Sequence, residues 1–295
     1  MKLLLTNSGS YPRIGETPEL QELRRTTGAW ERGEKTAEEL KAAEDAVVRA
    51  AVDEQVRAGL DLVTDGQVRW YDPISHLASK LGGIEINGLL RFFDTNFYFR
   101  QPVAKGPLAR KDGLVVSEYQ FARSVSSKPV KPVLTGPYTL AKFTLVEHDP
   151  YRGFNTLVRA YAECLAAEMD ALAAAGAEVI QLDEPAILKH PADFPILQRA
   201  VEYLAHHKGR ARLALYVYFG DPGPLYERLQ KLPMDILGLD FTYNPKLVSK
   251  IVLSGSSKGL GLGLPHEEPP AVRRGSVPRH GLRQDRRKDQ AAVEP

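Results

Sequence analysis

The chain has 295 residues, a formal net charge of +2 and 43% hydrophobic residues, which is the composition of a globular protein. So small a net charge gives no support for nucleic acid or membrane partners, and no stretch approaches the roughly 20 apolar residues of a membrane span. The single cysteine, Cys164, excludes an intramolecular disulfide and fits a reducing compartment, so we expect a cytoplasmic protein without a signal peptide.

Short apolar runs that end in turns predict a series of strands. In chain order they lie at residues 2–6, 60–66, 131–137, 177–185, 211–221, 234–241 and 258–264. Continuous apolar character is typical of parallel strands that are covered on both faces. The sequence therefore predicts about seven strand–helix units.

Helical patterns fall between several of these strands. Residues 36–59 begin with the capping-box pair Thr36 and Glu39 and end at Gly59. Further helices are expected at 154–175, 191–207 and 223–232.

This alternation predicts an α/β protein, and eight such units close a (β/α)8 TIM barrel. We expect a barrel domain over 1–264 that lacks its last strand–helix unit. The aromatic segment 91–103 is interpreted as an insertion packed against the barrel mouth. A doubly wound open sheet is the alternative, but no G-x-G-x-x-G follows the first strand.

Residues 265–295 are rich in proline and arginine and have no apolar periodicity. Such a composition buries too little surface to offset chain entropy, which favours a disordered tail. The other interpretation is an aberrant segment that replaced the original coding sequence, for example after a frameshift. A barrel without its last strand has two unpaired edges, and a homodimer is one way to cover them.

Polar and aromatic side chains follow each predicted strand, and in a barrel they converge on one mouth. Carboxylates, a basic group and flat rings in one pocket suit a small zwitterionic substrate beside an aromatic one. Strand by strand, they are Ser8, Ser10, Tyr11 and Arg13; Asp65, Gln67, Arg69, Trp70, Asp72 and His76; Tyr138 and Phe143; Asp183 and Glu184; Tyr216, Tyr218 and Asp221; and Asp240 and Tyr243. Structural interpretations remain open for each, because acids favour helix starts and alternating tyrosines are typical of a half-buried strand.

Four motifs, "SGSYPR", "TDGQVRW", "TGPYTLA" and "IQLDEPAIL", occur in this order along the chain. Together they resemble the cobalamin-independent methionine synthase family, in particular its short single-barrel members. The resemblance implies a (β/α)8 barrel that transfers a methyl group from a reduced folate to the sulfur of homocysteine.

The resemblance also implies roles for individual residues. Ser10 would hold the amino-acid carboxylate, and Asp183 would hold its ammonium group. Further substrate-binding candidates are Gln67, where the family has glutamate, Glu184, and the folate-lining Tyr138 and Phe143.

A zinc ion that binds the homocysteine thiol is the cofactor implied by the resemblance. Its His-x-Cys ligands on the fifth strand correspond to Tyr216 and Tyr218 here, and a glutamate of the sixth strand corresponds to Asp240. The last ligand, a cysteine on an eighth strand, has no counterpart. A phenol gives up its proton only near pH 10, so we expect no zinc and no other cofactor in this chain.

Three functions remain as hypotheses. The first is a methyltransferase that acts on homocysteine or a related thiol with a folate-like donor. The second is a non-catalytic barrel that binds an amino acid or a pterin. The third is a lyase or decarboxylase that uses Asp183 or Glu184 as its acid or base.

Overall fold

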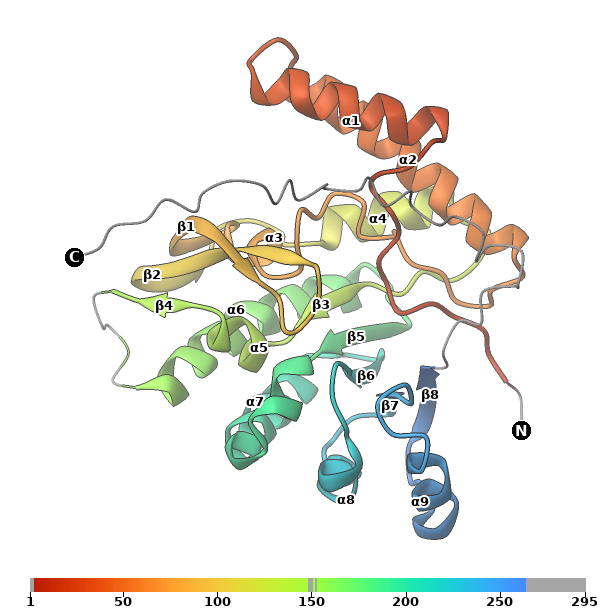
Figure 1. The fold of residues 1–295 in the computed structure, drawn as a ribbon, viewed down its shortest axis with the longest axis vertical. Coiled ribbons are helices and arrows are strands. Elements are labelled where there is room, and N and C mark those ends of the chain that lie inside the picture. Colours follow the sequence, from red (N-terminus) through yellow and green to blue (C-terminus); the bar gives the residue numbers. More distant parts are fainter. Residues whose placement is uncertain (1–2, 148–150, 152, 264–295) are drawn as a thin grey trace, which may run out of the picture. The chain divides into compact units, whose positions relative to one another are not determined.

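The computed structural model describes residues 3–147, 151 and 153–263 of the chain (Figure 1). The described residues belong to one compact unit, Met1–Leu264. The segment 265–295 lies outside the described residues, so the tail expected there stays a prediction.

A parallel sheet forms the centre of this unit, with the strand order β3–β5–β6–β7–β8 (Figure 1). Two isolated parallel bridges extend the order, because Thr6 pairs with Leu62 and Val63 pairs with Val130. Within the described residues, seven parallel segments therefore follow one another in chain order, which confirms the predicted α/β fold with a parallel sheet. The strands are β3 Val133–Thr135, β5 Val179–Asp183, β6 Arg212–Val217, β7 Ile236–Asp240 and β8 Gly259–Gly263.

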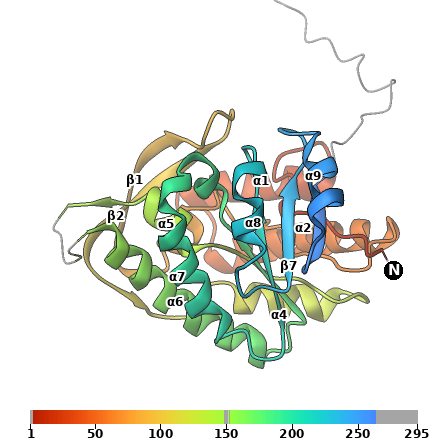
Figure 2. The ribbon, with the colours of Figure 1, turned by 90° about the horizontal axis from the view of Figure 1, so that it is seen from below.

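Helices α6, α7, α8 and α9 lie along the outer side of these strands (Figures 1 and 2). The helices predicted at 36–59, 154–175 and 191–207 are confirmed, whereas 223–232 holds only two short turns of helix. No described helix is long and apolar enough to cross a membrane. The helices are α1 Pro18–Glu31, α2 Ala37–Arg57, α3 Ser75–Ala78, α4 Val116–Val125, α5 Pro137–Lys142, α6 Phe154–Ala174, α7 Phe194–Ala205, α8 Tyr226–Leu229 and α9 Leu247–Ser254, with 3-10 turns η1 Pro185–Lys189, η2 Pro191–Asp193 and η3 Gly223–Leu225.

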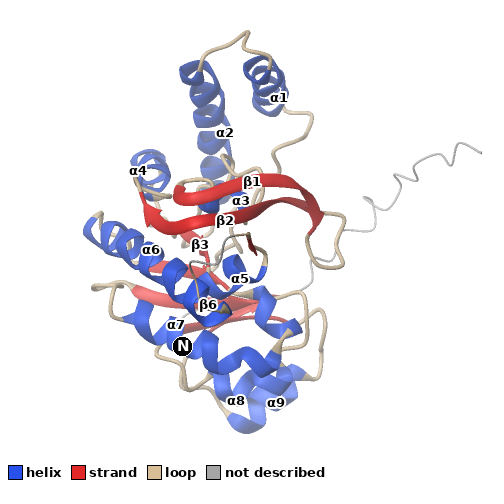
Figure 3. Cartoon of the chain, turned by 90° about the vertical axis from the view of Figure 1, so that its left-hand side faces the viewer, coloured by secondary structure: helices blue, strands red, loops and turns tan. Residues whose placement is uncertain are grey.

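The capping box of α2 forms as the sequence predicts. The Thr36 hydroxyl accepts a hydrogen bond from the Glu39 amide at 3.2 Å, and the Glu39 carboxylate accepts one from the Thr36 amide at 2.9 Å. Helix α1, which was not predicted, packs against α2 (Figure 3). Its Leu23 is buried. The sequence does indicate the start of this helix, because Thr17 caps it and Pro18 occupies its first turn.

The aromatic segment 91–103 belongs to a long antiparallel hairpin, β1 Leu81–Arg91 and β2 Tyr98–Arg110, to which the short strand β4 Leu145–Val146 is added. Phe92 is buried in this hairpin, and its ring centroid lies 5.3 Å from that of Phe143 and 6.1 Å from that of Phe219. Phe143 follows α5 and Phe219 follows β6. The hairpin therefore packs against the carboxyl ends of the strands, as predicted.

The prediction that residues 2–6 form a buried strand is wrong. Leu3, Leu4 and Leu5 are 75%, 54% and 58% exposed, and only Thr6 makes a strand-like bridge. In the described part of the chain no strand pairs with the other edge of this segment. The described residues therefore leave the three leucines largely exposed.

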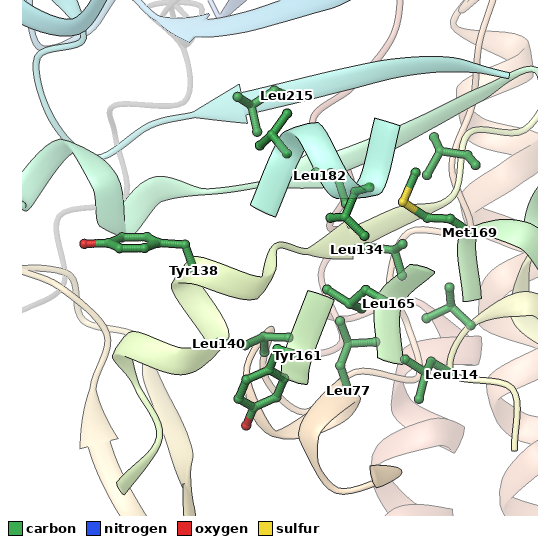
Figure 4. Close-up of a cluster of buried hydrophobic side chains, with 14 of the residues drawn as sticks. Leu77, Leu114, Leu134, Tyr138, Leu140, Tyr161, Leu165, Met169, Leu182 and Leu215 are labelled. Atoms are coloured by element: carbon green, nitrogen blue, oxygen red, sulfur yellow. The ribbon is translucent and has the colours of Figure 1, made fainter. Parts of the chain in front are cut away.

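The main core lies between the outward faces of the strands and helices α5 and α6 (Figure 4). Leu134, Leu182 and Leu215 point outward from β3, β5 and β6 and are fully buried. Leu165 and Met169 of α6 meet them (Figure 4). Because strand residues alternate between faces, their neighbours Thr135, Gln181, Asp183 and Tyr216 lie on the inner face of the sheet.

Candidate functional site

Asp183 is the last residue of β5 and lies opposite Thr135 of β3 and Tyr216 of β6. Its carboxylate accepts hydrogen bonds from Gln181 Nε2 at 2.7 Å and from the Tyr218 hydroxyl at 3.2 Å. Desolvation in the sheet interior raises the pKa of Asp183 to about 6, and the Gln181 hydrogen bond opposes this rise. At neutral pH the group is an oriented carboxylate that can accept a hydrogen bond from an ammonium group.

The turn after the first segment is tied to this carboxylate. Gln181 Nε2 donates to the Ser8 carbonyl at 2.7 Å as well as to Asp183. Ser10, two residues further on, is exposed. The turn that carries Ser10 therefore lies at the same end of the sheet as Asp183.

Gln67 lies against the same turn. Gly9 has φ of +148°, and a Cβ at this position would lie 3.4 Å from Gln67 Cδ and 3.3 Å from Val133 Cγ2. Gln67 itself has φ of +50°, and its amide donates to the Asp65 carboxylate at 3.1 Å. This turn conformation holds the Gln67 side chain beside Gly9.

Glu184 takes a different position from its neighbour Asp183. It is fully buried, and its carboxylate accepts hydrogen bonds from the Tyr138 amide at 2.9 Å, the Thr139 amide at 2.7 Å and the Thr139 hydroxyl at 2.6 Å. Desolvation raises the pKa of Glu184 to about 7, while these donors oppose the rise. Because both oxygens are engaged at the start of α5, the geometry favours a positioning role over the substrate contact expected from the sequence.

Tyr138 does not present a flat face to a ligand. Its side chain is fully buried, its hydroxyl donates to Asp193 at 2.8 Å, and its ring packs edge-on against Phe154. Phe143 is partly buried and contacts Phe92 and Phe99 of the hairpin, with ring centroids 5.3 and 4.9 Å apart. Of the two expected folate-lining residues, Phe143 alone lies in the aromatic cluster at the strand ends.

Two further strand-end residues are used within the fold. Asp72 is buried and accepts hydrogen bonds from the amides of Ile74 at 2.9 Å and Arg100 at 3.1 Å, so it anchors the hairpin. His76 stacks on Trp70 and its Nε2 lies 2.9 Å from Glu118. Neither side chain joins Asp183.

The residues at the family's zinc positions do not fit a zinc ion. Burial raises the pKa of Tyr216 to about 12 and that of Tyr218 well above 10, so both phenols keep their protons. Tyr218 already donates to Asp183, and Asp240 Oδ1 accepts from the Thr242 amide at 2.9 Å. Zinc requires thiolate, imidazole or carboxylate donors, and the two phenols are none of these.

The Tyr216 ring occupies the inner face of the sheet at this point. It lies directly over Gly238 of β7, and its hydroxyl is 2.9 Å from the place where a Cβ on Gly261 of β8 would lie. Two glycines on adjacent strands thus leave the volume that this ring fills.

Lys131, which was not predicted as a site residue, is 1% exposed and points into the sheet interior. Its Nζ donates to the Asn7 carbonyl at 2.9 Å and lies 4.9 Å from the Tyr216 ring centroid. The signal was a single charged residue inside the apolar run "PVKPVLTG".

Comparisons with known proteins agree on one family. The family model described as "Cobalamin-independent synthase, Catalytic domain" matches residues 5–273. The chain is 30% identical over 254 residues to methionine synthase of Saccharolobus solfataricus, which covers 85% of this chain and 75% of that protein. It is 27% identical over 271 residues to 5-methyltetrahydropteroyltriglutamate–homocysteine methyltransferase of Halalkalibacterium halodurans, of which it covers 35%.

Solved structures share the fold. The B12-independent methionine synthase of Shewanella sp. W3-18-1, in complex with selenomethionine, superposes with a TM-score of 0.64 at 24% identity, covering 78% of this chain and 72% of that one. A putative B12-independent methionine synthase of Listeria monocytogenes gives 0.68 at 20% identity, covering 90% and 82%. The architecture is thus that of the methionine synthase barrel domains. The chain belongs to the cobalamin-independent methionine synthase catalytic-domain family.

Proposed function

We propose that this chain is an S-methyltransferase of the methionine synthase type, which takes homocysteine or a related amino-acid thiol as acceptor and a folate-like donor. The observation that carries the proposal is Asp183, a partly buried carboxylate oriented by Gln181 and Tyr218 at the carboxyl end of β5. We also propose that the fold is a (β/α)8 barrel short of its last unit, because seven parallel segments follow one another in the part of the chain that the structure describes.

In this proposal the chain's own residues bind and orient the acceptor. Asp183 accepts hydrogen bonds from the ligand's ammonium group, and Ser10 donates to its carboxylate. The ligand's sulfur then extends along the inner face of the sheet, and the Phe92–Phe143–Phe219 cluster offers apolar ring surface to a flat donor.

The thiol must lose its proton before its sulfur attacks the methyl carbon. A free thiol with a pKa near 8.5 is a few per cent ionised at pH 7, which costs only about 2 kcal/mol. As the bond between the methyl carbon and the donor nitrogen breaks, that nitrogen takes up a proton.

A second function, a non-catalytic barrel that binds an amino acid, is favoured by one observation. The Tyr216 ring fills the inner face over Gly238 and Gly261, where a reacting sulfur would need room. Methyl transfer and binding alone are separated by a direct assay.

Calorimetry with methionine and homocysteine tests the shared part of both functions. We expect binding by the unmodified protein, at least about tenfold weaker in Asp183→Asn because a charge-assisted hydrogen bond is lost. Asp53→Asn, on the exposed face of α2, is the matched control. Binding that is unchanged in Asp183→Asn would refute the site. Formation of methionine from homocysteine and a methyl-folate then supports the enzyme, and binding without turnover supports the second function.

A further inference from the structure

Lys131 is an unusual residue to find inside a sheet. Its side chain is 1% exposed, and its Nζ has one protein acceptor, the Asn7 carbonyl at 2.9 Å. Within the described residues no carboxylate lies within ion-pair distance of this nitrogen. Burying an ammonium group without a direct counter-ion costs free energy. Other groups must therefore stabilise the charge of Lys131 in the folded protein.

Asp183 is the carboxylate whose charge acts on Lys131. The Tyr216 ring covers the ammonium at 4.9 Å, and a ring face stabilises a cation. Desolvation lowers the pKa of Lys131 to about 8, and the charge of Asp183 is what opposes that fall. Asp65 also lines the small cavity beside Lys131.

The same coupling acts on Asp183. The groups near its carboxylate are Gln181 on its own strand, Tyr216 of β6, Tyr218 just after β6, Lys131 just before β3 and the neighbouring Glu184. Of these, Lys131 is the one cation. Tyr218 and Gln181 are neutral donors, and Glu184 disfavours a second negative charge.

We propose that Lys131 is a positioning residue whose ammonium, sealed beneath the Tyr216 ring, keeps Asp183 ionised so that Asp183 can accept the ammonium group of an amino acid. This inference rests on the proposed amino-acid site. Lys131 makes no contact with substrate in this proposal, because its side chain is 1% exposed and its Nζ donates to the Asn7 carbonyl. Its role is to supply positive charge to the interior of a site whose residues do not fit a zinc ion.

The pH dependence follows from the two groups. Asp183 is protonated below about pH 6, and Lys131 loses its proton above about pH 8, so both are charged between these values. Removing Lys131 raises the pKa of Asp183, because the charge of Lys131 favours the ionised carboxylate. The acidic limit of amino-acid binding then moves upward, towards neutral pH.

The test is calorimetric titration with methionine from pH 5 to pH 8.5. In Lys131→Met, which keeps the length of the side chain, we expect the midpoint of the acidic limb to rise by about 1–2 pH units, with affinity recovering as the pH increases. Lys128→Met, three residues earlier on the same segment and partly exposed, should leave the midpoint unchanged. A uniform loss of affinity at every pH, or an unchanged midpoint, would overturn the proposal.

A second measurement does not depend on ligand binding. Carbon-13 NMR of labelled aspartate carboxyls follows Asp183 directly, with Asp183→Asn identifying its signal. Its midpoint should rise in Lys131→Met, and the Lys131 side-chain signal should titrate at lower pH in Asp183→Asn, because the coupling is reciprocal. If methionine does not bind but both shifts occur, the proposed function fails and the Lys131–Asp183 coupling stands. If Lys131→Met does not fold, the Lys131 shift in Asp183→Asn decides.

Discussion

The carboxylate of Glu184 occupies the space where a side chain on residue 136 would begin. A Cβ on Gly136 would collide with the Glu184 carboxylate, and that carboxylate caps the amides of Tyr138 and Thr139. The Gly136–Pro137 turn at the start of α5 therefore packs against Glu184, a buried acid that directly follows β5. Gly136 is required here for close approach, since its φ of −72° suits any residue.

We expect Gly136→Ala to destabilise the protein by about 1–3 kcal/mol, the range for overpacking a tight interior. Urea unfolding measures this. Gly88→Ala is the control, because a Cβ at Gly88 meets no atom within 4 Å. Equal effects of the two substitutions would contradict the packing of Glu184 against residue 136.

The neighbours Asp183 and Glu184 show what the sequence could and could not predict. Strand alternation and the position at a strand end suffice to predict Asp183 on the inner face. The same alternation turns Glu184 outward to α5. The resemblance of the motif does not show that these two neighbouring acids point in different directions. Lys131 was hidden because a buried charge looks, in sequence, like an interruption of an apolar run.

Unfolding free energy should decrease as the pH rises from about 4 to 7. Desolvation raises the pKa of Asp65 to about 6, Asp183 to about 6 and Glu184 to about 7, all above their values in the unfolded chain. At these three groups the folded state binds more protons than the unfolded state, so they make the slope of stability against pH negative. The lowered pKa of the buried His76 acts in the opposite direction, and the three acids outnumber it.

The measurement is urea unfolding at pH 5 and pH 7.5. Asp65→Asn, which cannot ionise, should reduce the difference between the two values by about 1–3 kcal/mol. Asp53→Asn, exposed on α2, should not change it. A pH dependence that is the same in all three proteins would show that Asp65 titrates normally.

We predict that the purified protein carries no stoichiometric zinc. Tyr216 and Tyr218 stand at the expected ligand positions with pKa values raised by burial, and their phenols do not ionise at neutral pH. Elemental analysis after dialysis measures the metal content. About one tightly held zinc per chain, released by substitution of Tyr216 or Asp240, would show that this strand end binds metal after all.

The N-terminal leucines and the core leucines should differ sharply in what they contribute to the free energy of unfolding. Leu4 is 54% exposed, whereas Leu134 of β3 is fully buried against α6. Leu134→Ala removes buried methyl groups and leaves a cavity, which costs about 2–5 kcal/mol. Leu4→Ala removes atoms that water already reaches, so its cost should stay within about 0.5 kcal/mol. Urea unfolding of the two variants at one protein concentration makes the comparison.

A cost for Leu4→Ala that approaches that of Leu134→Ala would mean that a further segment or a second copy of the chain covers residues 3–5 in solution. Repeating the measurement over a hundredfold range of protein concentration separates these two, because stability gained from a second copy rises with concentration and stability gained within one chain does not.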